Sequence, residues 1–202
     1  MQERKPGTQM TIHRNTLLAA AWACMVFSVY GTVHAAVTMV DGTAFSNTVT
    51  VNQTRLHLQG AALLRYLYFI EAYTGALYLP ETADGSRALE NIPRHLVLEY
   101  RVAISADDFA KATEKKIRDS VSDAVFQELL PKIAALNRLY QDVVPKDRYA
   151  LTYIPGTGTI LTLNGTPLGT IEGAAFSRAV FSIWIGDNPI DKGFRDKLLG
   201  KR

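Results

Sequence analysis

The longest apolar stretch of the chain runs from Leu56 to Pro80 (LHLQGAALLRYLYFIEAYTGALYLP) and contains only two glycines, Gly60 and Gly75. Aromatic and apolar residues favour strands, and a glycine inside such a run typically marks a bend. The pattern therefore predicts two long strands that are joined or kinked at Gly75.

Alternation within this stretch predicts which side chains share a face. Arg65, Leu67, Phe69, Glu71 and Tyr73 fall on one face, provided that no bulge intervenes. A guanidinium and a phenol on a largely apolar face can together hold a carboxylate or another oxygen-bearing ligand. The alternative interpretation is that Arg65 pairs with Glu71 or lies at the rim, and spacing alone favours this alternative.

Strand and helix periods divide the rest of the chain. Ser105 followed by Asp107 and Asp108 is typical of a helix start, and Asn164-Gly165 is a hairpin turn signal. We predict strands at 38–40, 48–51, 95–102, 148–153, 157–163 and 166–171, a short helix at 87–91 begun by Ser86, a helix from 105, a second one to about 140 that Pro131 kinks or splits, and helices at 174–185 and 191–199. This order indicates an α+β fold, an antiparallel sheet with helices on one side.

The N-terminal residues are typical of a signal peptide. Basic residues precede a 14-residue apolar run at 17–30, and Val33-His34-Ala35 offers small residues at the positions that signal peptidase reads. We predict a signal peptide at 1–35, cleaved after Ala35, and a single domain at 36–202, with Met1 or Met10 as the true start. The apolar run is shorter than the roughly 20 residues that span a bilayer. The sequence therefore predicts a periplasmic or secreted protein without a membrane span after cleavage.

Charge and cysteine content change once residues 1–35 are removed. The net charge of +3 includes three basic residues and one acidic residue of this segment, so the remainder carries +1 and gives no reason to expect nucleic acid binding. The only cysteine, Cys24, lies in the same segment. His57 and His95 stand on separate predicted strands, away from paired carboxylates. We therefore expect no metal, no cofactor and no covalent nucleophile.

Four motifs together resemble the chalcone isomerase-like family, in its bacterial secreted branch. They are the long apolar stretch, ISADDFAKAT, YIPGTGTILTLNG and GAAFSRAVFSIWIGDNPIDKGFRDKLLG, within residues 48–200. The resemblance implies an open-faced β-sandwich, a large antiparallel sheet covered by a layer of helices. This agrees with the element order predicted from periodicity.

The resemblance also implies candidate site residues. Plant chalcone isomerases use an arginine, two threonines, a tyrosine and an asparagine, and the matching positions are Arg65, Tyr73, Phe109, Lys116 and Ile183. Only the arginine is retained as a residue type, and the loss of several hydrogen bonds argues against chalcone cyclisation. In fatty-acid-binding members an arginine and a tyrosine are thought to hold the carboxylate, and Arg65 and Tyr73 resemble that pair.

Three hypotheses follow. The leading one is a non-catalytic periplasmic protein that binds an apolar ligand with an acidic head group, such as a fatty acid, between the long strands and the helices at Phe109 and Trp184. The second is an isomerase or intramolecular lyase for an enone-type substrate, with Arg65 stabilising the oxyanion and Tyr73 donating a proton. The third is a structural envelope protein without a ligand.

Overall fold

The computed structural model describes residues 36–67 and 69–201 of the chain. Strands are β1 (Val37–Val40), β2 (Thr43–Ser46), β3 (Thr48–Val51), β4 (Thr54–Tyr66), β5 (Ile70–Pro80), β6 (Arg94–Tyr100), β7 (Arg148–Ile154), β8 (Gly158–Leu163) and β9 (Thr166–Ile171). Helices are α1 (Ala106–Arg118), α2 (Asp123–Asn137), α3 (Ala174–Ile185), α4 (Lys192–Leu198) and the 3-10 turn η1 (Gly85–Arg87). The predicted signal peptide lies outside the described residues.

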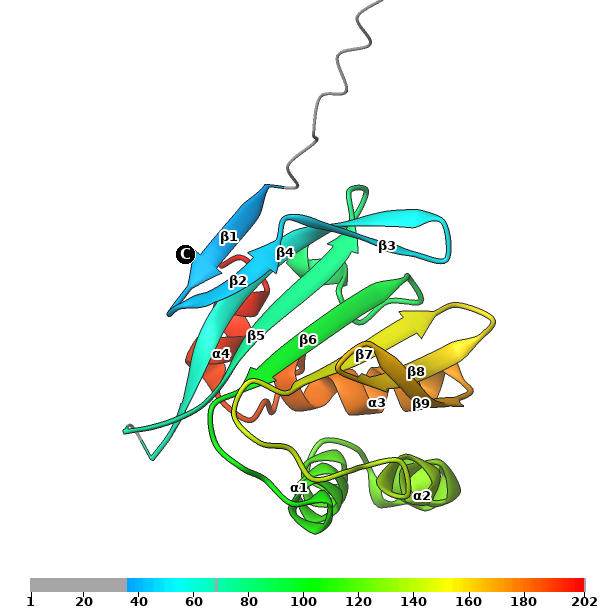
Figure 1. The fold of residues 1–202 in the computed structure, drawn as a ribbon. Coiled ribbons are helices and arrows are strands. Elements are labelled where there is room, and N and C mark those ends of the chain that lie inside the picture. The colour runs from blue at the N-terminus through cyan, green and yellow to red at the C-terminus, as the bar shows by residue number, and fades with distance from the viewer. Residues whose placement is uncertain (1–35, 68, 202) are drawn as a thin grey trace, which may run out of the picture. The chain divides into compact units, whose positions relative to one another are not determined.

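Seven strands form one antiparallel sheet in the order β3-β4-β5-β6-β7-β8-β9, and β1 and β2 form a separate hairpin (Figure 1). Each strand of the sheet pairs with its neighbours in the chain, so the sheet is a meander. The prediction of an α+β fold with an open-faced sheet and a helical layer is confirmed.

Alternating side chains give the sheet two different faces. Leu77 and Leu79 of β5 belong to the large core shared with the four helices. Ala76, which precedes Leu77, and Tyr78, which lies between the two leucines, pack with Phe45 of β2 in a smaller core. Alternation along one strand thus separates a helix side from a hairpin side, and the helix side carries the candidate site.

Capping residues set the helix limits. Ser105 accepts a hydrogen bond from Asp108 N at the start of α1, and Ser122 does the same for α2. Helix α2 continues through Pro131, so the predicted split does not occur. The predicted short helix at 87–91 is instead the 3-10 turn at 85–87, which Asp84 caps. Strand β2 was not predicted.

The prediction that Gly75 joins or kinks the long strands is wrong. Gly75 lies inside β5, and the connection between β4 and β5 falls at residues 67–69. A Cβ atom at Gly75 would lie 2.6 Å from Cζ of Phe194. Glycine is needed at this position because the Phe194 ring of α4 packs directly on the backbone of β5.

Among residues 36–67 and 69–201, the structure contains no helix with the length and apolar character needed to cross a bilayer.

Candidate functional site

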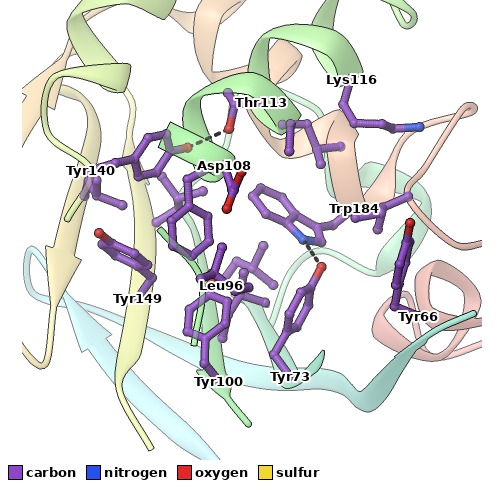
Figure 2. Close-up of a pocket in the computed structure, with 18 residues that line it drawn as sticks. Tyr66, Tyr73, Leu96, Tyr100, Asp108, Thr113, Lys116, Tyr140, Tyr149 and Trp184 are labelled. Carbon is purple, nitrogen blue, oxygen red and sulfur yellow. Dashed lines mark hydrogen bonds between the residues drawn. The ribbon is translucent and has the colours of Figure 1, made fainter. Parts of the chain in front are cut away.

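A cavity of about 500 Å³ opens between the helix side of the sheet and helices α1 and α3 (Figure 2). The sheet contributes alternate residues of β6, namely Leu96, Leu98 and Tyr100, with Tyr149 and Leu151 of β7. These side chains face the cavity because every second residue of a strand points to the same side. The cavity wall is thus a direct product of strand alternation.

Helix α1 forms the opposite wall. Phe109, Ala112, Thr113 and Lys116 line the cavity at spacings of three and four residues, which place them on one face of a helix. From α3, Ile183 and Trp184 complete the wall. Helix α1 and the C-terminal end of α3 therefore meet over the sheet.

Aromatic rings dominate one side of the cavity. Phe109 packs against Tyr100, Tyr140 and Tyr149 with ring centroids 5.3 Å apart in each pair. The Tyr73 ring lies 5.4 Å from that of Tyr100. Edge-to-face and stacked pairs at these distances contribute roughly 0.5–1.5 kcal/mol each beyond area burial, so this wall is preformed.

Most polar atoms in the cavity belong to neutral groups. Trp184 Nε1 donates to the Tyr73 hydroxyl at 3.0 Å (Figure 2). The Thr113 and Tyr140 hydroxyls are 2.8 Å apart, and Tyr149 donates to the Gln141 carbonyl at 2.9 Å. Burial raises the pKa of Tyr73 and of Tyr140. These phenols therefore stay protonated at physiological pH.

The two charged residues of the lining come from α1. Lys116 Nζ donates to the Pro189 carbonyl at 3.1 Å, and its amine points away from the Tyr73–Trp184 pair (Figure 2). Asp108 is exposed, and its carboxylate accepts from the Ser105 hydroxyl at 2.7 Å. Exposed Tyr66 also lines the cavity. The accessible end is thus polar, whereas the interior is apolar and aromatic.

Arg65 does not line the cavity. The strand register pairs Leu64 with Tyr73 and Arg65 with Glu71, which leaves Ala72 as an extra residue on β5. Such a bulge shifts the alternation by one residue, so Tyr73 joins Leu64 on the helix side while Arg65 and Glu71 lie on the other side. The prediction that Arg65 and Tyr73 share a face is therefore wrong.

The Arg65 guanidinium instead pairs with Glu71. Its Nη2 lies 3.0 Å from Oε1 of Glu71, and the two side chains are 50% and 40% exposed. Glu71 also accepts from Arg101 Nη1 at 2.6 Å, and Arg101 bonds the Thr74 hydroxyl at 3.2 Å. The hydrogen bond from Arg65, with Arg101 nearby, lowers the pKa of Glu71. The alternative interpretation of Arg65 as an ion-pair partner is confirmed.

The structure brings together five of the six predicted site residues: Tyr73, Phe109, Lys116, Ile183 and Trp184. The phenols of Tyr100, Tyr140 and Tyr149 also line the cavity and were not predicted. The alternation of HLVLEY already placed Tyr100 on the same face as Leu96 and Leu98, so that residue could have been found. No group of metal-ligating side chains occurs in the part of the chain that the structure describes.

The comparisons with known proteins agree with this architecture. The profile of a family described as chalcone isomerase-like matches residues 37–200. A crystal structure of a fatty-acid binding protein of Arabidopsis thaliana superposes with a TM-score of 0.63 at 15% identity, over 79% of this chain and 92% of that one. At this identity the likeness shows the fold alone. No curated protein matches the sequence. Because the profile covers most of the sequence, the chain belongs to the chalcone isomerase-like family.

Proposed function

We propose that this protein binds one small apolar molecule, such as an acyl chain, in the cavity under α1, without transforming it. The observation that supports this proposal best is the cavity itself. Its volume of about 500 Å³ lies in the range of ligand pockets, about 300–1,000 Å³. Its lining is mostly apolar and aromatic, with a few neutral hydroxyls, which is the composition typical of such sites.

The residues proposed to contact the ligand are Tyr73, Phe109, Ile183 and Trp184 in the interior and Lys116 at the accessible end. The fold neighbour from Arabidopsis is described as a fatty-acid binding protein, so an acyl chain is the first ligand class to test. Because a signal peptide is predicted at 1–35, we further propose that the protein meets its ligand outside the cytoplasm.

The isomerase hypothesis receives less support. It required a cation beside Tyr73 to stabilise developing oxyanion charge. The guanidinium assigned to that role lies on the other side of the sheet and is paired with Glu71. Binding without chemistry therefore remains our proposal.

The experiment is extraction of the purified protein with organic solvent, followed by mass spectrometry of the extract. We expect about one apolar molecule per chain. Ala112 lines the cavity from α1, so Ala112→Phe should reduce the ligand content at least severalfold by occupying its space. Ala134 is exposed on α2, and Ala134→Phe is the matched control that should retain the ligand. An empty wild-type protein that also fails to take up added acyl compounds would contradict the proposal.

A further inference from the structure

The hydrogen bond between Trp184 and Tyr73 leaves one phenol proton unused. An indole N–H can only donate, so Tyr73 Oη is the acceptor in the 3.0 Å bond. Among the described residues, none accepts the Tyr73 proton. Tyr73 is 6% exposed and lines the cavity, so this proton is a donor available to a bound molecule.

Tyr100 adds a second donor to the same cavity. Its side chain is 3% exposed, and its ring packs 5.4 Å from that of Tyr73. Within residues 36–67 and 69–201 its hydroxyl has no hydrogen-bond partner. Its oxygen atom is not fully buried and Tyr100 lines the cavity, so a ligand oxygen can accept its hydrogen bond.

The cationic groups of this region lie elsewhere. Lys116 is the one cation among the described cavity residues, and its amine is bonded to the Pro189 carbonyl at the accessible end. Asp108 adds a negative charge to the same lining. Arg65 is paired with Glu71 behind the sheet. An ionised carboxylate in the interior would therefore lack a counter-ion.

The presence of hydroxyl donors and the absence of a cation in the described interior of the cavity decide which ligand head group it favours. A carboxylate moved into an apolar site without a cation loses several kcal/mol of hydration free energy. A carbonyl oxygen accepts the same hydrogen bonds and loses much less. Burial raises the pKa of both Tyr73 and Tyr100, so both phenols stay protonated and each keeps a proton to donate.

We infer that the cavity selects apolar ligands whose polar end is a neutral oxygen acceptor, such as an ester or ketone carbonyl, held by the hydroxyls of Tyr73 and Tyr100. The inference rests on the proposed function, because it names the ligand class of the same cavity. It departs from the carboxylate ligand that the sequence suggested, since that ligand depended on Arg65 beside Tyr73.

The test uses the fluorescence of Trp184, which lines the cavity and is the only tryptophan beyond residue 35. Methyl octanoate, octanoate and nonane are titrated separately at about pH 8, where a carboxylic acid is fully ionised. We expect methyl octanoate to bind at least tenfold tighter than octanoate. It should also bind tighter than nonane, although nonane is the more hydrophobic molecule.

Two variants separate hydrogen bonding from hydrophobicity. Tyr100→Phe removes a hydroxyl that bonds no described residue, so it should weaken ester binding about fivefold and leave nonane binding unchanged. Tyr153→Phe is the matched control, because the Tyr153 hydroxyl bonds Asn91 and lies outside the cavity; ester binding should be unchanged. An ester-to-nonane ratio that stays the same in both Tyr100→Phe and Tyr73→Phe would overturn the inference.

The outcomes also distinguish this inference from the proposed function. If none of the three compounds binds, the proposed function fails. If octanoate binds as tightly as the ester, the inference is overturned while the cavity remains a binding site. Loss of that octanoate binding in Lys116→Met would then place the carboxylate at the accessible end.

Discussion

Arg94 is a buried cation that holds the helical layer on the sheet, and its replacement should be strongly destabilising. The residue is 1% exposed at the start of β6. Its Nη1 donates to the carbonyls of Ala88 and Glu90 at 3.0 and 2.7 Å, and its Nη2 donates to the Ser177 hydroxyl of α3 at 2.7 Å. No described carboxylate lies within ion-pair distance of it.

Two aromatic rings enclose the same guanidinium. The centroids of the Tyr153 and Phe181 rings lie 4.6 and 4.7 Å from its Cζ, where a desolvated cation gains about 2 kcal/mol per ring. Burial lowers the pKa of Arg94 to about 10, which still leaves the group charged at neutral pH. Carbonyls and rings thus take the place of a counter-ion.

The expected loss of stability follows from the polar groups that lose a hydrogen-bond donor when Arg94 is replaced. In Arg94→Met the side-chain volume is largely kept, but two carbonyls and one hydroxyl lose a charged donor, at about 1–3 kcal/mol for each buried group. The substitution also removes a charge whose burial costs hydration free energy, and this gain offsets part of the loss. We expect a net loss of about 2–4 kcal/mol in the free energy of unfolding for Arg94→Met.

The assay is urea unfolding followed by circular dichroism. Arg87→Met is the matched control, because Arg87 is half exposed and pairs with Glu90 at 2.8 Å on the surface; its loss should stay below about 1 kcal/mol. An Arg94→Met protein as stable as the wild type would refute the reasoning. It would mean that desolvation of the guanidinium cancels its hydrogen bonds and ring contacts.

Three further predictions concern stability. Burial lowers the pKa of His95 from 6.5 to about 4, so the unfolded chain binds a proton at a pH where the folded chain does not. Stability should therefore fall by roughly 2–3 kcal/mol between about pH 6.5 and 4, and His95→Gln should flatten this part of a urea-midpoint profile; an unchanged slope would contradict the assignment. Gly75→Ala should lose about 1–3 kcal/mol, because its Cβ would lie 2.6 Å from the Phe194 ring, and a thermal midpoint equal to that of the wild type would show that the ring moves freely. Glu99→Gln should lose about 2–3 kcal/mol in urea unfolding, since the buried carboxylate lies 2.6 Å from Arg148 Nη2 and accepts from the Thr43 hydroxyl at 3.0 Å; a loss below about 0.5 kcal/mol would argue against this ion pair.

Periodicity predicted most of the elements because local patterns determine them. Helix α3 was predicted with its observed limits, since an apolar run ends at Gly186. The hairpin of β8 and β9 was predicted from the Asn164-Gly165 dipeptide, and in the structure both residues adopt the positive φ angles that its turn requires. Such signals lie within a few residues and need no knowledge of the rest of the fold.

The candidate site was less predictable because it depends on register. One extra residue at Ala72 reverses the alternation between Glu71 and Tyr73, and the sequence carries no local signal for this bulge. Tyr140 follows α2 and reaches the cavity only through the packing of α2 beside α1. Residues that meet through tertiary packing cannot be placed from the period of a single element.

The most direct test of the cavity as the ligand site is a crystal structure with a bound acyl ester that carries bromine at the end of its chain. We expect one anomalous bromine peak inside the cavity, among Leu96, Leu151 and Leu161, with the ester carbonyl within hydrogen-bond distance of Tyr73 or Tyr100. Bromine in the outer groove beside Arg65 and Lys197, with the cavity empty, would contradict it.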